Sequence, residues 1–361
     1  MTPRFHSLIV ADVRRETPDA VSVAFAVPPD LAEAYGFEPG QYLTLRSRLE
    51  GEEVRRSYSI CSGPDEGELR IAVKRVEGGA FSSFANAALA PGQTIDVMTP
   101  TGRFGTAAAP DEARLHVGFA AGSGITPILS IVRGILAREP RSRVFLFYGN
   151  RSTGDMLFRT ALEELKDRYL DRLSVFHVLS QEEQDVPVLN GRLDGDKARL
   201  LLTHIVPAGA IDHLFVCGPP GMSEAVEETA LALGVPAERI HHERFVSEFG
   251  GKPRSAPPKP ADGAAPEAAA KRALLTVDGK RREVPVREGD TVLDAALRAG
   301  MDLPYACRGG MCSTCRAKVV AGEVRMDVNY SLEPWELAAG FVLTCQARPV
   351  TERVAVDFDA M

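Results

Sequence analysis

Four cysteines near the end of the chain constrain its fold and its chemistry more than any other feature. Three of them share one short loop and a fourth follows later, in the order Cys307, Cys312, Cys315 and Cys345. The C-x4-C-x2-C spacing with a remote fourth cysteine is the ligand pattern of a plant-type [2Fe–2S] cluster. Thiolates suit such a cluster because ferric iron bridged by sulfide binds soft anionic sulfur. The pattern therefore predicts a chain that handles single electrons.

Two other interpretations of these cysteines are a zinc site and a set of structural thiols. Zinc sites usually pair two short C-x2-C knuckles, whereas three cysteines of this chain crowd one loop. Gly309 and Gly310 also favour a cluster loop, because glycine reaches positive φ and lets backbone N–H groups approach the sulfurs.

Length, charge and the remaining cysteines limit the other possibilities. A chain of 361 residues suggests two or three domains, and a net charge of −7 argues against a nucleic-acid partner. No apolar run reaches the length of a membrane span, and the start M-T-P-R-F-H-S lacks the apolar segment of a signal peptide. Cys61 and Cys217 do not form a disulfide framework, so we expect a cytoplasmic protein that does not bind membranes.

Residues 1–108 are expected to form a small β domain. Short strand-like runs separated by Pro and Gly turns are typical of a closed barrel or a sandwich. The expected strands are Ser7–Val13, Ala20–Val27, Tyr42–Arg46, Arg56–Cys61, Leu69–Val76 and Thr94–Met98. One helix-like stretch, Phe81–Leu89, interrupts them.

Residues 109–248 change to apolar strands that alternate with amphipathic helices, the pattern of a doubly wound parallel α/β sheet. The expected strands are Leu115–Ala120, Val144–Tyr148, Leu173–Leu179, His213–Cys217 and Ile240–Phe245. The expected helices are Pro127–Arg138, Phe158–Tyr169 and Met222–Leu233.

A linker and a third domain follow. Residues 249–271 are rich in Pro, Ala and Gly without a hydrophobic period, which is typical of an inter-domain linker. In residues 272–361, a hairpin precedes a helix that starts with the capping box Thr291-x-x-Asp294 and stops at Gly300. The end of this domain is acidic, which fits either a solvated face or a docking surface. Its acidic residues include Glu323, Asp327, Glu333, Glu336, Glu352, Asp357 and Asp359.

Two motifs in the β domain have the chemistry to bind a phosphate and a flat ring. In Arg56-Ser57-Tyr58-Ser59 the arginine can neutralise a phosphate, the tyrosine can stack on a flat ring and a serine can bond a ring nitrogen. The stretch Gly78–Phe84 opens a helix with glycines, whose free N–H groups can bind a pyrophosphate. The alternatives are an ordinary edge strand and an N-capped helix.

Two further motifs lie where parallel strands end. Ala121–Pro127, with Gly122, Gly124 and Thr126, follows the first strand and opens the first helix, where nucleotide pyrophosphates bind. Cys217-Gly218-Pro219 ends the fourth strand, and a small polarisable side chain there can lie against a nicotinamide ring. The alternative for Cys217 is a buried core cysteine.

Arg151 and Ser152 follow the second parallel strand. An arginine with a hydroxyl at this position can hold a 2′-phosphate, whereas an acidic residue would prefer a free ribose hydroxyl. This favours NADPH over NADH, and the alternative is a surface arginine.

Together these motifs resemble the ferredoxin–NADP reductase superfamily over the whole chain except the linker. The resemblance implies a flavin barrel, a nicotinamide domain and a plant-type ferredoxin domain of the β-grasp type. It implies that Tyr58 stacks on the flavin, that Ser59 approaches flavin N5 and that Phe245 covers the other flavin face. It assigns further flavin contacts to Arg56, Val73, Lys74, Gly79, Ser82 and Ser83. Some relatives bind FMN through an arginine at the position of Ala80, so its absence favours FAD.

Within the superfamily, the cysteine loop and D-V-N-Y-S-L-E-P-W-E-L look very like the reductase subunits of phenylacetyl-CoA epoxidase systems. This likeness implies that electrons pass from NADPH through FAD and the cluster to a di-iron oxygenase. We expect the loop around Arg308 and Met311 to contact that acceptor. One alternative is the reductase of a ring-hydroxylating or steroid oxygenase. An alternative of another class is a non-catalytic iron–sulfur carrier or redox sensor.

Overall fold

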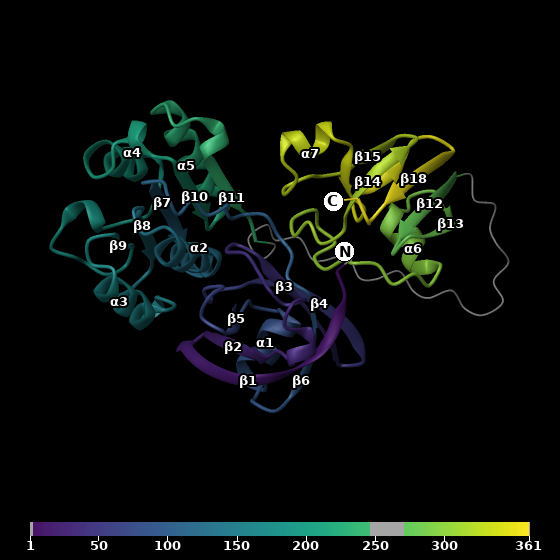
Figure 1. The fold of residues 1–361 in the computed structure, drawn as a ribbon, viewed down its shortest axis with the longest axis horizontal. Helices are drawn as coiled ribbons and strands as arrows, with labels where there is room; N and C mark the ends of the chain where they lie inside the picture. The colour runs from purple at the N-terminus through teal and green to yellow at the C-terminus, as the bar shows by residue number, and fades with distance from the viewer. Residues whose placement is uncertain (1–2, 246–270, 361) are drawn as a thin grey trace. The chain divides into compact units, whose positions relative to one another are not determined.

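A computed structural model of the protein describes residues 3–245 and 271–360 (Figure 1). The expected linker, 249–271, lies outside the described residues except for its last residue. The chain divides into two compact units. Most of the β domain and the parallel α/β domain belong to one unit, and most of the ferredoxin-like domain belongs to the other.

A closed antiparallel barrel forms the first part of the larger unit. Its strand order is β4-β3-β6-β1-β2-β5. The strands are β1 (Phe5–Thr17), β2 (Ala20–Ala26), β3 (Tyr42–Leu49), β4 (Glu52–Ser59), β5 (Leu69–Lys74) and β6 (Thr94–Met98). Ile60, directly after β4, bridges to Ile71 on β5 and so joins the two ends of this order. Closure removes the open edges of the sheet.

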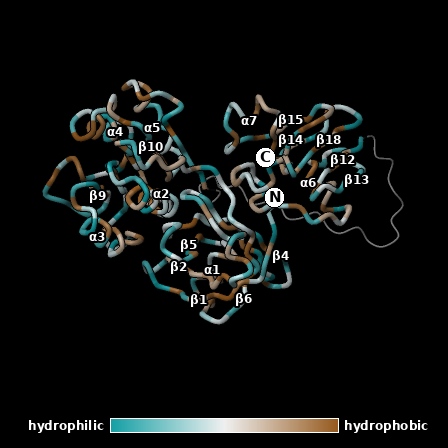
Figure 2. Tube along the Cα trace, viewed as in Figure 1, coloured by the Kyte–Doolittle hydropathy of each residue, from teal (hydrophilic) through white to brown (hydrophobic). Residues whose placement is uncertain are grey.

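Alternating side chains build the barrel core. Val21, Val23 and Phe25 of β2 and Leu43 and Leu45 of β3 are buried in one cluster. In Figure 2 the trace of the barrel carries both hydrophobic and hydrophilic residues. Helix α1 (Ala80–Ala87) packs on the barrel through Phe81 and Ala85.

The second part of the larger unit is a parallel sheet with strand order β11-β10-β7-β8-β9. The strands are β7 (Leu115–Ala121), β8 (Arg143–Asn150), β9 (Leu173–Leu179), β10 (His213–Cys217) and β11 (Ile240–Glu243). The chain runs outward from β7 to β9 and then returns to the other side of β7 with β10. The boundary between β7 and β10 is therefore the topological switch point, where ligands bind in such sheets.

Helices cover both faces of this sheet. They are α2 (Ile125–Arg138), α3 (Arg159–Arg168), α4 (Gly195–His204) and α5 (Pro220–Ala232). Ala120 of β7 shares a core with α2 and α3, whereas Val117 and Phe119 share a core with α4 and α5. Helix α4, capped by the Asp194 side chain, was not expected from the sequence.

The smaller unit contains a mixed sheet with strand order β13-β12-β18-β14-β16, in which β12 and β18 are parallel. The strands are β12 (Lys271–Val277), β13 (Lys280–Val286), β14 (Arg316–Ala321), β16 (Phe341–Leu343) and β18 (Arg353–Asp357). A two-stranded sheet of β15 (Val324–Met326) and β17 (Ala347–Pro349) lies beside it, together with helices α6 (Val292–Arg298) and α7 (Pro334–Ala338). Helix α6 begins with the expected capping box of Thr291 and Asp294.

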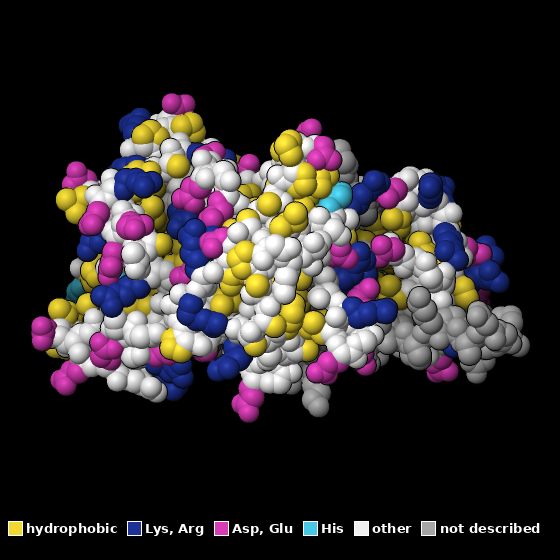
Figure 3. Space-filling model, turned by 90° about the horizontal axis from the view of Figure 1, so that it is seen from below, with side chains coloured by type: hydrophobic (Ala, Val, Ile, Leu, Met, Phe, Trp, Pro, Cys, Tyr) yellow, Lys and Arg dark blue, Asp and Glu magenta, His cyan; other side chains and the backbone are white. Residues whose placement is uncertain are grey.

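The surface and the helices add two observations. On the face seen in Figure 3, acidic and basic side chains lie intermixed. Among the described residues, no helix combines the length and apolar character that a membrane span requires.

Candidate functional site

The motif expected to bind a flavin, Arg56–Ser59, lies on strand β4 of the barrel. Ser59 is buried, while Arg56, Ser57 and Tyr58 are partly exposed. The Tyr58 ring lies 5.6 Å from the Phe81 ring, centroid to centroid. This strand therefore presents a guanidinium, hydroxyls and an aromatic ring within four consecutive residues.

Helix α1 and strand β5 supply the other expected flavin contacts. Helix α1 begins after Gly79 without a side-chain cap, which leaves its first N–H groups available to a phosphate. Val73 is fully buried in the barrel core, and Lys74 contacts Asp19 through Nζ and Oδ2 at 3.6 Å. The Val73 side chain therefore packs into the barrel core.

The two serines of α1 differ in orientation. The Ser82 hydroxyl accepts a hydrogen bond from the Val76 N–H at 3.1 Å and donates to the Gly79 carbonyl at 3.2 Å. A Cβ on Gly79 would lie 2.5 Å from the Ser82 Oγ, so glycine is needed there. Ser82 thus closes the turn, and the exposed Ser83 is the better placed serine for a phosphate.

Two strand ends meet at the switch point of the parallel sheet. Cys217, the last residue of β10, is the register partner of Ala120 on β7. A Cβ on Gly124 would lie 2.0 Å from the Cys217 carbonyl oxygen, so this close approach requires glycine. Gly122 has a φ of +53° and Gly218 is buried. The expected nucleotide-binding turns are therefore packed directly against each other.

One hydrogen bond connects the barrel to this edge of the sheet. The Ser59 Oγ donates to the Glu243 Oε2 at 2.9 Å, across 184 positions of sequence. Glu243 ends β11 and is the register partner of Cys217. Phe245, two residues further on, packs against the same core cluster as Cys217. The three residues expected to be catalytic, Ser59, Cys217 and Phe245, therefore lie in one region. Sequence reasoning placed Glu243 in the motif that ends with Phe245 but gave its carboxyl no role.

Desolvation controls the protonation of Glu243. Loss of hydration raises the pKa of this carboxyl from 4.5 to about 7, and the hydrogen bond from Ser59 opposes that rise. A carboxyl with such a pKa can hold or release a proton near neutral pH, at Oε2, beside the Ser59 hydroxyl.

Arg151 and Ser152 both contact one carboxylate. Arg151 Nη2 forms a short ion pair with Asp155 Oδ1, and the Ser152 Oγ donates to Asp155 Oδ2 at 2.7 Å. Thr153 is held nearby by Glu182, which accepts bonds from its backbone N–H at 2.6 Å and its hydroxyl at 2.7 Å. A 2′-phosphate at this site would have to compete with Asp155 for Arg151.

The four cysteines of the smaller unit gather in two pairs. Cys307 is hydrogen-bonded to Cys312, and Cys315 is hydrogen-bonded to Cys345. The hydrogen bond from Cys312, together with backbone N–H groups such as that of Gly309, lowers the pKa of Cys307. The hydrogen bond from Cys315 lowers the pKa of Cys345. Two thiol pairs match a cluster of two irons with two protein ligands each. Among the described residues, no group of three or more His, Cys, Asp or Glu side chains is arranged for a single metal ion.

The backbone of the cysteine loop differs from the expectation in one respect. Gly310 has a φ of +80°, but Gly309 does not have a positive φ, and the other left-handed residues of the loop are Arg308 at +54° and Ser313 at +48°. The Gly309 N–H nevertheless points to the Cys307 sulfur at 3.3 Å. The loop therefore directs backbone donors at its sulfurs, as a cluster requires.

Three residues expected at the surface of this unit are buried. Arg308, expected to contact an electron acceptor, is 7% exposed and pairs with Asp294, and Met311 is also 7% exposed. Glu336, expected in the acidic stretch, pairs with Arg316 at 2.6 Å. The charges of Arg308 and Glu336 therefore serve internal ion pairs.

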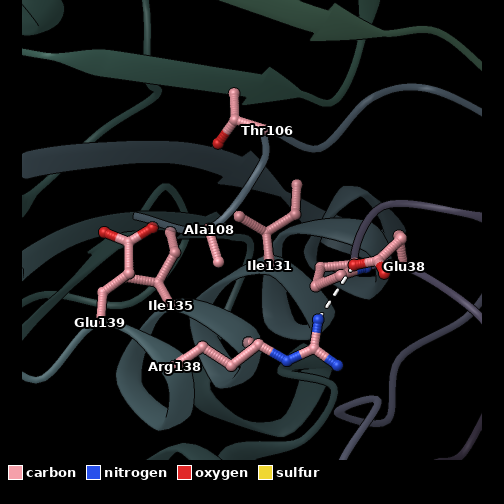
Figure 4. Close-up of a pocket in the computed structure, with 9 residues that line it drawn as sticks. Glu38, Thr106, Ala108, Ile131, Ile135, Arg138 and Glu139 are labelled. Carbon is pink, nitrogen blue, oxygen red and sulfur yellow. Dashed lines mark hydrogen bonds and ion pairs between the residues drawn. The ribbon is translucent and has the colours of Figure 1, made fainter. Parts of the chain in front are cut away.

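A small cavity lies apart from these motifs, between the barrel and α2 (Figure 4). Glu38 on one side is bonded to Arg138 on the other at 3.0 Å, and Ile131 and Ile135 form part of the wall. Its volume of about 20 Å³ accommodates one water molecule and no cofactor.

Three family models match the chain: an oxidoreductase FAD-binding domain at residues 7–105, an oxidoreductase NAD-binding domain at 119–228 and a 2Fe-2S iron-sulfur cluster binding domain at 275–350. The chain is 47% identical to a subunit of the 1,2-phenylacetyl-CoA epoxidase of Escherichia coli (strain K12), over 99% of the chain and 98% of that protein. It is 34% identical to the ferredoxin reductase component of 3-ketosteroid-9-alpha-monooxygenase from Rhodococcus rhodochrous, over 97% and 96%.

Solved structures show the same fold. Phthalate dioxygenase reductase is 22% identical, with a TM-score of 0.57 and coverage of 98% of both chains. A cytochrome P450 reductase from Amycolatopsis is 28% identical, with a TM-score of 0.57 over 67% of this chain and 70% of its own.

The fold and the sites define an NAD(P)H-dependent oxidoreductase that combines FAD, a nicotinamide nucleotide and a [2Fe–2S] cluster. The chain belongs to the ferredoxin–NADP reductase superfamily, in the group that carries a plant-type ferredoxin domain.

The raised pKa of Glu243 predicts how stability depends on pH. Because the folded protein keeps a proton that the unfolded chain has lost, its stability should fall as the pH rises from 4.5 to about 7. One such group contributes a slope of at most about 1.4 kcal/mol per pH unit. Glu243→Gln should remove this part of the decline, as measured by urea unfolding of the holoprotein followed by flavin fluorescence. Glu238→Gln, at an exposed position of the same domain, is the control. An unchanged pH dependence in Glu243→Gln would contradict the assignment.

Proposed function

We propose that this protein carries electrons from NADPH, by way of FAD and its [2Fe–2S] cluster, to the di-iron oxygenase of a phenylacetyl-CoA epoxidase. The observation that carries the proposal is the pairing of two sites on one chain. Ser59 and Glu243 join strand β4 of the barrel to the edge of the parallel sheet where the nucleotide is expected to bind. The smaller unit separately brings four thiols together.

The residues of the larger unit bind and orient. Tyr58 supplies a ring for the flavin, and the turns at Gly122–Gly124 and Cys217–Pro219 bring the nucleotide to the switch point. Bound FAD supplies the change from two-electron to one-electron chemistry. A proton lies between the Ser59 Oγ and the Glu243 Oε2. We place hydride transfer beside this pair. Phe245 excludes water from the same region.

The residues of the smaller unit prepare the thiolates. Within each hydrogen-bonded pair, the pKa of Cys307 or Cys345 is lowered, while the same contact and burial raise the pKa of its partner, Cys312 or Cys315. Backbone N–H groups in the loop favour the anionic form of the sulfurs. Plant-type clusters lie near −400 mV, close to flavins and nicotinamides, so electron transfer needs no large driving force.

The relatives support the choice of electron acceptor. Several are named as reductase components or subunits of oxygenases, and the relative at 47% identity is named for 1,2-phenylacetyl-CoA epoxidase. The exposed carboxylates Glu323, Glu333 and Glu352 give the smaller unit a surface that suits a basic patch on such a partner.

Reconstitution with an oxygenase component tests the proposal. NADPH consumption should require both the phenylacetyl-CoA epoxidase oxygenase and phenylacetyl-CoA, and it should slow as salt screens the charges over about 8–10 Å. Cys345→Ser should keep FAD and NADPH–ferricyanide activity while losing this coupling, because the cysteine loop lies in a different unit from Tyr58, Ser59 and helix α1. Equally fast NADPH consumption with a steroid or ring-hydroxylating oxygenase would contradict the assignment of this partner. A rate of NADPH consumption that does not change with salt would contradict the electrostatic steering.

The preference for NADPH is a separate proposal that rests on Arg151 and Ser152. Both side chains converge on Asp155, so together they form a ready-made site for an oxyanion. A 2′-phosphate brings more charge than the Asp155 carboxylate and can replace it as the partner of Arg151.

Arg151→Ala should therefore raise the KM for NADPH and leave the KM for NADH nearly unchanged. A lost charge-assisted bond is worth on the order of 1.5–3 kcal/mol, or roughly 10- to 150-fold in KM. Steady-state ferricyanide reduction with each nucleotide measures the effect. Arg159→Ala, which breaks an exposed ion pair with Glu163, is the matched control. Equal losses with both nucleotides would show that Arg151 does not bind the phosphate.

A further inference from the structure

A buried ion pair holds the cysteine loop from its inner side. Arg308 directly follows the ligand Cys307, and its Nη2 forms a short ion pair with Asp294 Oδ1. The two side chains are only 7% and 9% exposed. Arg308 also has a φ of +54°, a left-handed conformation that a residue with a Cβ adopts at a cost. A specific contact must therefore hold it there.

Asp294 is fixed by the start of helix α6. Its Oδ2 accepts a hydrogen bond from the Thr291 N–H at 3.3 Å, and its own N–H donates to Thr291 Oγ1 at 3.1 Å. This capping box leaves Oδ1 directed at Arg308. Helix α6 thus provides a rigid anchor for the loop.

A second contact continues from Arg308 to the fourth ligand. The Gln346 Nε2 donates to the Arg308 carbonyl at 2.9 Å and also lies 3.5 Å from the Cys345 sulfur. A continuous chain of contacts therefore runs from Asp294 through Arg308 and Gln346 to Cys345. It connects the first and last ligands of the cluster to one carboxylate.

We propose that Asp294 is a positioning residue for the [2Fe–2S] cluster that holds the loop and sets the reduction potential by neutralising Arg308. Reduction adds a negative charge to the cluster, so a nearby carboxylate opposes it and a nearby guanidinium favours it. With Asp294 ionised, these two effects offset each other. The inference rests on the cluster site and does not depend on which oxygenase accepts the electrons.

Asp294→Asn removes the charge and keeps an oxygen for the Thr291 N–H. The cluster of the holoprotein should then be easier to reduce, by on the order of tenfold in the electron equilibrium, which is about 59 mV for one electron. An anaerobic redox titration followed by the EPR signal of the reduced cluster measures this shift. The flavin potential, followed by absorbance in the same titration, should stay unchanged.

Asp290→Asn is the matched control. Asp290 precedes the same helix, and its carboxylate pairs with Arg298 through both oxygens and accepts a hydrogen bond from the Arg287 N–H at 3.0 Å. Its substitution should leave the cluster potential at the parent value. An unshifted potential in Asp294→Asn, or an equal shift in Asp290→Asn, would overturn the proposal.

A second variant tests the sign of the charge effect. Arg308→Gln removes the positive charge and leaves Asp294 in place, so it should make the cluster harder to reduce, while Arg308→Lys should stay near the parent. If Asp294→Asn loses its cluster while Asp290→Asn keeps it, the positioning role of Asp294 is supported. The reduction potential of Arg308→Gln then tests the charge effect. An upward shift or no shift in Arg308→Gln would overturn that effect.

Discussion

The larger unit depends on the packing of its barrel against the parallel α/β domain, where Ala20, Cys61 and Ala72 share one buried cluster with helix α2. The hydrogen bond between Ser59 and Glu243 belongs to this contact. It joins a strand of a closed barrel to the last strand of a parallel sheet, at 2.9 Å. The barrel has no open edge at which to add a partner, so the two folds meet through side chains. This contact places strand β4, where the flavin is expected to bind, beside Cys217 and the switch point. It is one of several contacts between the two folds, which also include the ion pairs of Arg138 with Glu38 and Asp65.

The chain separates two kinds of electron chemistry by placing them in different compact units. Hydride chemistry needs close contact between two rings and a controlled proton, and we propose that Tyr58, Phe245 and the Glu243 carboxyl of the larger unit serve this purpose. Single-electron chemistry needs a cluster whose ligands do not move. The smaller unit provides this through paired thiols and a loop anchored to α6 by Asp294.

Much of the fold follows from local sequence patterns. The gathering of the cysteines, the capping box at Thr291 and the parallel strands could be predicted, because each has a signal in residues close together in the chain. Helix α4 was not, because a short amphipathic run gives a weak signal.

The details of the sites were less predictable for three physical reasons. The bond from Ser59 to Glu243 spans 184 positions, and no local pattern reports such a contact. The Ser82 hydroxyl turns inward to close its own turn, which depends on the backbone geometry at Gly79. The left-handed residue beside Cys307 is Arg308 and not Gly309, because a buried ion pair supports a conformation that propensity assigns to glycine.

If the two units divide the chemistry in this way, electrons enter from the nucleotide bound at the parallel sheet and reach the cluster only through the flavin. Anaerobic rapid mixing of the holoprotein with NADPH, followed by flavin absorbance and by freeze-quenched EPR of the cluster, tests this most directly. We expect flavin bleaching to precede cluster reduction, and protein stripped of FAD to show no cluster reduction on the same timescale. Cluster reduction that is equally fast without FAD would contradict this order of electron transfer.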